Sequence, residues 1–258
     1  MAKMKSEENK CKLCGEVHKL GKSHIIPEAF FTKYRTPNAA AMMLTNTAGY
    51  FPKKSWNGIY DPSILCQDCE RKFQDFDNYG VKVLLRDMQN YFTRNNHHDG
   101  NYFLHSNNID QQFLLKFLIS VLWRASVSSN KFYNKVNLGP FEPLAANVIL
   151  NPHGDVPNCF AGLLSYWIND KGADGDMLMD PFREKWGDVN AYRVYLGFFV
   201  AYVKVDQRQW VAPFSRLALG IRDELHVTSR NLEGSNDSFA LSRTATEAIL
   251  HAQRKGSA

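Results

Sequence analysis

Four cysteines in the first third of the chain have the spacing of metal ligands. They form two Cys-x-x-Cys units, Cys11–Cys14 and Cys66–Cys69, separated by residues 15 to 65. Such a unit places two sulfur atoms on one tight turn, so two units can surround one Zn²⁺ at about 2.3 Å per bond. A zinc ion held by four thiolates is closed, and it contributes folding energy and fixed placement of its neighbours rather than catalysis.

Two residues beside these cysteines could carry the chemistry that the zinc does not. His24 lies between the two units in the segment SHIIP, and Glu70 directly follows Cys69. If a strand from the first unit and a helix from the second pack across the zinc, the two side chains face each other. The imidazole could then act as a general base toward water. The carboxylate could hold Mg²⁺ or Mn²⁺, which would stabilise charge on a scissile phosphate.

These motifs resemble those of a known group. The order C-x-x-C, S-H-I-I-P, L-C-x-x-C-E is similar to that of the HNH endonuclease superfamily, with its treble-clef, ββα-metal fold, and of its bacterial SHIIP-type members. The segment FLISVLWR, residues 117 to 124, resembles the Trp-Arg helix of those proteins. The resemblance implies that His24 is the general base, that Glu70 is a ligand of the catalytic ion and that Asp61 stands near the Asn that orients the base. It also suggests a role in bacterial defence against foreign DNA.

One position departs from the pattern and leaves alternatives open. Ser23 stands where most HNH enzymes have an Asp ligand, and a hydroxyl binds Mg²⁺ less well than a carboxylate does. Asp75 or Asp77, further along the same predicted helix, could add a ligand. The first hypothesis is therefore a metal-dependent endonuclease acting on nucleic acid, with DNA as the expected partner. The second is a catalytically inactive, zinc-stabilised module that binds nucleic acid or regulates, and the third is a protein-interaction scaffold.

The distribution of charge is compatible with phosphate contact near the cysteines. Residues 1 to 90 hold 14 Lys and Arg against 10 Asp and Glu, a net charge of +4, whereas the rest of the chain has 17 against 16, or +1. A small excess of this kind also suits an ordinary solvated face. The side chains that flank the site and are predicted to contact phosphates are Lys53, Lys54, Arg71 and Lys72.

Several other groups are more simply explained by structure than by function. The run His97-His98-Asp99 lies in an Asn- and Gly-rich stretch and suits an exposed loop. The acidic residues between Asp170 and Asp180 lack the order of a Ca²⁺-binding loop, which favours a solvated turn. The aromatic residues from Tyr192 to Tyr202 could stack on bases, but their strand spacing favours the core. Cys159 is predicted to be a buried thiol.

Hydrophobic patterning predicts a mixed α+β fold. Helices are expected over 28–34, 70–88, 242–254 and, with Asn108 as N-cap, the apolar-periodic segment 109–124. Residues 35–63 are predicted to be a long loop with a hairpin near 50–60, and 144–150 a short helix or strand. The residues expected to form β-structure are 192–210, with 160–168 as a partner strand.

The chain is expected to divide near a polar segment. Residues 95–108 are rich in Asn, His, Gly and Asp, which predicts a zinc module over 1–92 and a helical and β-containing region over 93–258. The hydrophobic fraction of 44% indicates a folded chain rather than a disordered one. No apolar run approaches the roughly 18 residues of a membrane span. The charged start MAKMKSEENKCK has no signal-peptide core, so a cytoplasmic location and no membrane partner are expected.

Overall fold

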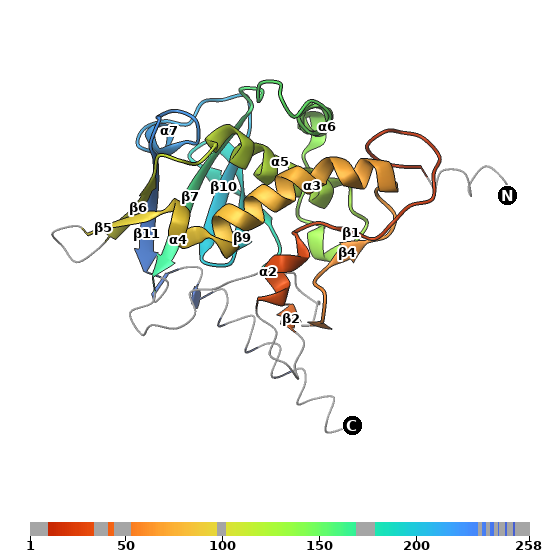
Figure 1. Cartoon of the computed structure of the whole chain (residues 1–258), viewed down its shortest axis with the longest axis horizontal. Coiled ribbons are helices and arrows are strands. Elements are labelled where there is room, and N and C mark those ends of the chain that lie inside the picture. Colours follow the sequence, from red (N-terminus) through yellow and green to blue (C-terminus); the bar gives the residue numbers. More distant parts are fainter. Residues whose placement is uncertain are drawn as a thin grey trace.

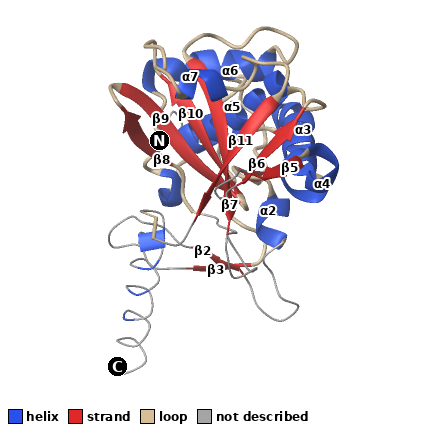
Figure 2. Ribbon diagram, turned by 90° about the vertical axis from the view of Figure 1, so that its left-hand side faces the viewer, coloured by secondary structure: helices blue, strands red, loops and turns tan. Residues whose placement is uncertain are grey.

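A computed structural model of the chain describes residues 10–33, 41–43, 53–96, 102–168 and 179–231, and scattered positions from 234 to 250. Its main feature is a seven-stranded sheet with strand order β5-β6-β11-β7-β10-β9-β8 (Figure 2). All neighbouring strands pair antiparallel except β11 and β7, which are parallel. The strands are β5 (Thr93–Asn96), β6 (Tyr102–Ser106), β7 (Phe160–Ile168), β8 (Phe182–Trp186), β9 (Val189–Leu196), β10 (Phe199–Val205) and β11 (Leu225–Asn231).

The central strands form where the sequence is dense in Val, Tyr and Phe. Every residue of β10 is buried, because this strand is covered on both faces of the sheet. β7 and β9 flank it in antiparallel register, which confirms the predicted strand 160–168 and the β-structure predicted from residue 192 as far as 205, whereas residues 206–210 lie beyond the end of β10. The tight turn between β9 and β10 uses Gly197 at φ +71°, a conformation that costs glycine little. The predicted mixed α+β fold is confirmed.

The most buried helix is α5 (Gln111–Val127), which packs on β7 and β10. Its N-cap is Asp110, whose side chain accepts a hydrogen bond from the Phe113 N–H, so the prediction of Asn108 as the cap was wrong by two residues. The Asn108 side chain instead accepts a hydrogen bond from Ser106. The helix is buried nearly all round because the sheet, α3 (Gln67–Val81) and α6 (Glu142–Leu150) all cover it (Figure 1).

The contact between α3 and α5 joins the cysteine-bearing region to the sheet. Phe73 of α3 stacks on Trp123 of α5 with ring centroids 5.7 Å apart, and Phe76 lies 4.9 Å from Phe113. Gly80 allows the helices to approach closely, since a Cβ atom there would lie 2.5 Å from the Phe117 ring. One hydrophobic core therefore contains residues from both sides of the predicted division at residue 92.

Two further two-stranded sheets are formed by residues of the N-terminal region. β1 (Ser23–His24) pairs antiparallel with β4 (Tyr60–Asp61), and both lie beside α3 (Figure 1). β2 (Ala41–Met43) pairs with β3 (Lys53–Ser55), so the expected hairpin within 50–60 was wrong: β3 and β4 pair with earlier segments instead. Between them, α2 (Glu28–Thr32) confirms the short helix after Pro27 and buries Phe30 and Phe31.

Other element boundaries differ from the expected ones. The predicted helix 70–88 begins earlier, as α3, and continues into a π-helical turn (Lys82–Arg86) and α4 (Met88–Tyr91). Residues of the polar segment 95–108, near which the chain was expected to divide, contribute to the β5–β6 pair of the main sheet. Residues 144–150 belong to α6, and α7 (Phe214–Leu217) is a short turn of helix. Most of the predicted C-terminal helix 242–254 lies outside the described residues. No helix among those described is long and apolar enough to cross a membrane.

Candidate metal centre and adjoining site

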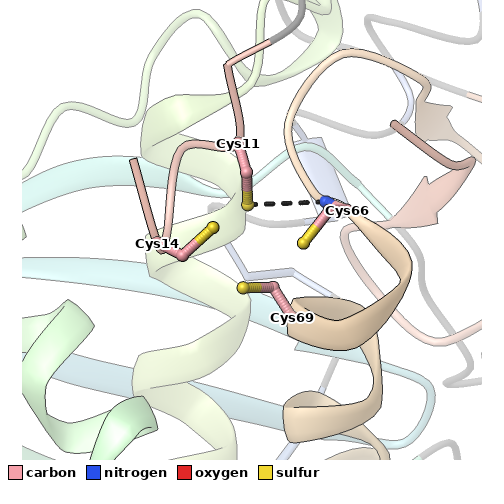
Figure 3. A group of neighbouring side chains, drawn as sticks. All are labelled: Cys11, Cys14, Cys66 and Cys69. Carbon is pink, nitrogen blue, oxygen red and sulfur yellow. Dashed lines mark hydrogen bonds between the residues drawn. The ribbon is translucent and has the colours of Figure 1, made fainter. Parts of the chain in front are cut away.

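The four predicted cysteine ligands come together. Their sulfur atoms all lie within 4.8 Å of one another, and they point toward a common centre (Figure 3). Cys11 and Cys14 come from the loop before β1, whereas Cys66 occupies the N-cap position of α3 and Cys69 lies in its first turn. All four are free thiols in the structure. The predicted cluster is confirmed, and among the described residues it is the only group of three or more candidate ligands so arranged.

The donor set fits a structural zinc ion. A tetrahedron of Zn–S bonds of 2.3 Å requires sulfur atoms about 3.8 Å apart, which the cluster can meet with small side-chain movements. The Cys66 N–H already points at Cys11 Sγ, at 3.4 Å. Burial raises the pKa of Cys11, but N–H groups of the surrounding turn outweigh this and lower it to about 7. Burial also raises the pKa of Cys69, so a cation among the sulfurs would relieve a cost of forming thiolates there.

Backbone hydrogen bonds hold the two cysteine units in register. Lys12 N–H donates to the Ile64 carbonyl at 2.8 Å, and Gly21 N–H donates to the Leu65 carbonyl at 2.9 Å. The segment between these two bonds is the loop that carries Cys14, and the strand β1 begins directly after it. The cluster thereby fixes where His24 stands relative to α3.

Glu70 is bound to Ser23, the residue that precedes His24 in β1. The buried Ser23 hydroxyl donates a hydrogen bond to Glu70 Oε2. Burial raises the pKa of Glu70, while the Ser23 hydrogen bond and the nearby charges of Arg124 and His24 partly oppose that rise. A half-buried carboxylate with these neighbours could supply one ligand to a divalent cation.

A backbone group that was not predicted from the sequence orients the His24 ring. His24 Nε2 lies 2.9 Å from the carbonyl oxygen of Asn57, in the turn between β3 and β4. A carbonyl only accepts hydrogen bonds, so Nε2 carries the proton and, in the neutral ring, Nδ1 is the basic nitrogen. The one available signal was the Asn57-Gly58 pair, which is typical of tight turns.

Asp61, predicted to stand near the orienting group, has a different environment. In the β1–β4 pair Asp61 is opposite Ser23 and Tyr60 is opposite His24, so Asp61 projects from the face opposite to the His24 ring. Its buried carboxylate accepts hydrogen bonds from Ser63, Ser128 and Ser129. Burial would raise the pKa of Asp61, but these hydrogen bonds outweigh it and lower the pKa. The residue fastens β4 to the end of α5.

Arg124 connects α5 directly to the candidate site. Its guanidinium is fully buried and binds the Asp77 carboxylate through both nitrogens, at 2.8 Å from Nη1 and 2.6 Å from Nη2. Nη1 also donates to the His24 carbonyl oxygen at 2.8 Å. The Arg124 guanidinium therefore joins the backbone of His24 to Asp77, which lies two turns after Glu70 on α3.

The remaining predicted residues are less closely associated with His24. Asp75 is exposed and, at five residues from Glu70, lies about 140° around the helix from it, whereas Asp77 shares the Glu70 face. Arg71 is exposed and pairs with Asp68, and Lys72 is exposed on the same helix. The backbone of Lys53 and Lys54 forms β3, and their side chains lie outside the described part of the structure.

The groups that the sequence assigned to structure are mostly buried. Cys159 and the tyrosines 192, 195 and 202 belong to the core, which confirms both expectations. Asp180 is buried beside Lys135, 3.1 Å from its Nζ, rather than in a solvated turn. The run 97–99 and the acidic residues 170, 174 and 176 lie outside the described residues.

Comparisons with protein-family models, with curated proteins and with solved structures give no match.

Proposed function

We propose that the chain is a metal-dependent endonuclease that hydrolyses nucleic-acid phosphodiester bonds, with His24 as the general base. The observation that carries the proposal is the hydrogen bond from His24 Nε2 to the Asn57 carbonyl, because it leaves Nδ1 as a base of fixed direction, one residue along β1 from the serine that binds Glu70. The order β1, β4, α3 around four cysteines also agrees with the ββα-metal arrangement of the HNH group, which the motifs resemble.

In this proposal the chain positions a water molecule and removes its proton. His24 Nδ1 accepts the proton as the water oxygen bonds to phosphorus and the P–O bond to the leaving group breaks. Glu70 is the residue that would hold Mg²⁺ or Mn²⁺, and such an ion would supply positive charge for the phosphate oxygens. Arg124 keeps the His24 backbone in place through its bond to the carbonyl oxygen. Defence against foreign DNA is the role that the resemblance suggests for this activity.

The second candidate function is a zinc-stabilised module that binds nucleic acid without cleaving it. The Ser23 hydroxyl favours it, because this group is buried and bound to Glu70, which leaves a single carboxylate at the proposed ion site. A lone carboxylate is a sparse ligand set for Mg²⁺, although substrate phosphates and water often complete such sites.

Plasmid nicking distinguishes the two functions. Zinc-loaded full-length protein is incubated with supercoiled DNA and Mg²⁺ or Mn²⁺, and the rate of nicking is compared with that of His24→Ala and Glu70→Gln. Loss of the general base is expected to lower the rate by about 10²–10⁴-fold. The matched control is His18→Ala, at an exposed position of the first cysteine loop. Binding without nicking by the wild type would sink the endonuclease proposal and leave the binding module.

A further inference from the structure

One tryptophan is exposed, and it lies in the turn that orients His24. All five tryptophans of the chain fall within the described residues. The indole of Trp56 is 53% exposed, whereas Trp123, Trp167 and Trp210 are buried and Trp186 is partly buried. Trp56 immediately precedes Asn57, whose carbonyl binds the His24 ring. The indole therefore presents an open aromatic face at the turn that contacts His24.

Three contacts within and around the turn from Ser55 to Gly58 hold Trp56 in place. The Ser55 hydroxyl donates to the Gly58 carbonyl at 2.7 Å, and Asn57 is tied to His24. Gly58 is buried with φ +81°, and a Cβ atom there would lie 2.2 Å from the Phe31 ring. The backbone beneath the indole is therefore fixed, so a ligand that stacks on Trp56 does not have to order the turn first.

Positive charge lies beside the turn. Lys22 Nζ is 5.0 Å from the centroid of the Tyr60 ring, and that ring meets the His24 ring edge-on at 5.9 Å. The ammonium group of Lys22 thus lies over the ring that contacts the imidazole. The surrounding first cysteine loop is also basic, since its exposed charged residues are Lys10, Lys12, Glu16, Lys19 and Lys22.

We propose that Trp56 stacks on an unpaired nucleobase of a single-stranded nucleic acid, while Lys22 neutralises the adjoining phosphate. An indole stacks on any base whose face is free, and such faces are open in single strands but covered in a duplex. The buried aromatic residues of β9 and β10 are not accessible for this role. The inference rests on the proposed function in that both place nucleic acid at His24, and it further specifies an unpaired strand as the substrate class.

Equilibrium binding without cleavage tests the stacking. Zinc-loaded full-length protein is titrated with a 20-nucleotide oligothymidylate and with a duplex of the same length, with no added Mg²⁺ or Mn²⁺. Binding of the single strand is expected to quench tryptophan emission, because the exposed indole is Trp56. Trp56→Ala is expected to raise the Kd for the single strand about tenfold, Trp56→Phe to raise it less, and both to leave the duplex Kd unchanged. The control is Phe239→Ala, another exposed aromatic position, at 66%.

The outcomes separate this inference from the nuclease proposal. Quenching and a Trp56-dependent Kd in a protein that cuts nothing would support the stacking site and overturn the nuclease. Nicking activity together with an unchanged single-strand Kd in Trp56→Ala would leave the nuclease standing and overturn the stacking site. A wild type that does not bind the oligothymidylate, or binds it without quenching, also overturns the stacking site.

Discussion

At the scale of single residues, the site is organised by groups that bind backbone atoms. The Asn57 carbonyl sets the direction of the His24 ring, and the Arg124 guanidinium holds the His24 carbonyl. Neither contact is visible in the spacing of the sequence, because the partners lie 33 and 100 residues apart. His24 and Glu70 could be proposed as site residues from their types and positions, whereas the groups that contact His24 could not be predicted.

Arg124 is the residue whose loss should be most damaging. Replacing Arg124 by Met keeps most of the side-chain volume but leaves the partly buried Asp77 carboxylate and the His24 carbonyl without their cationic partner. The free energy of unfolding is expected to fall by about 3–5 kcal/mol, measured by urea denaturation. Arg71→Met is the matched control, since the Arg71–Asp68 pair is exposed on the same helix and should contribute at most about 1 kcal/mol. Equal effects of the two substitutions would contradict the assignment.

Asp206 should make stability depend on pH in the acid range. Hydrogen bonds from Arg208 lower the pKa of Asp206 far below its ordinary value, despite an opposing contribution from burial. Because the folded state holds the proton less tightly than the unfolded state, this contribution is full above about pH 4 and is lost as pH falls toward the lowered pKa. Urea titrations from pH 7 to pH 2 should show a shallower acid decline for Asp206→Asn than for the wild type. An acid decline of Asp206→Asn as steep as that of the wild type would contradict this prediction.

At the scale of elements, the turn from Ser55 to Gly58 determines the geometry of the site. It depends on Gly58 for two separate reasons, a positive φ and the close approach of Phe31. The turn was predicted only as part of a long loop, because its packing partner lies on α2, more than twenty residues earlier.

A pair of glycine substitutions can separate strain from packing in that turn. Gly58→Ala and Gly187→Ala both place a side chain at positive φ, +81° and +63°, but only the first meets an atom within 4 Å. Gly187→Ala is expected to cost about 1–2 kcal/mol of stability from backbone strain alone. Gly58→Ala should cost more and should also lower the nicking rate, since the Asn57 carbonyl moves with the turn. The expectation fails if the two variants have equal stability.

The elements themselves were predicted unevenly. Strands β7, β9 and β10 and helix α5 followed from dense or periodic apolar sequence, because burial dictates those patterns locally. The β5–β6 pair was not predicted, because its polar residues lack the apolar pattern of a strand. These residues join the sheet because β6 pairs with β11, which is distant in the sequence. The α3–α5 contact was missed as well, because a glycine facing a phenylalanine has no signature until both helices are placed.

At the scale of the whole molecule, the cysteine cluster is expected to act on global stability. It ties residues 10–21 to 64–69, and these segments belong to the same core as the sheet. Removal of zinc by a chelator should lower the Tm, and a loss of about 3 kcal/mol corresponds to roughly 6–12 °C in a chain of this size. Metal analysis should give one zinc per chain, reduced in Cys66→Ser and unchanged in Cys159→Ser. A chelated protein with unaltered Tm would contradict a structural zinc.

The shared core also predicts how the region 1–92 behaves by itself. In the full chain, α3 rests on α5 through Phe73 and Phe76, and Asp77 is neutralised by Arg124. A chain cut after residue 92 loses the α5 residues that contact Phe73, Phe76 and Asp77, and it exposes both phenylalanine rings to water. The zinc cluster would then have to hold the fragment folded without that apolar contact. We expect residues 1–92 with zinc to retain metal but to unfold without a cooperative thermal transition, measured by circular dichroism. A sharp transition in this fragment would show that the zinc cluster alone is sufficient to fold the site, and that the contact with α5 only orients it.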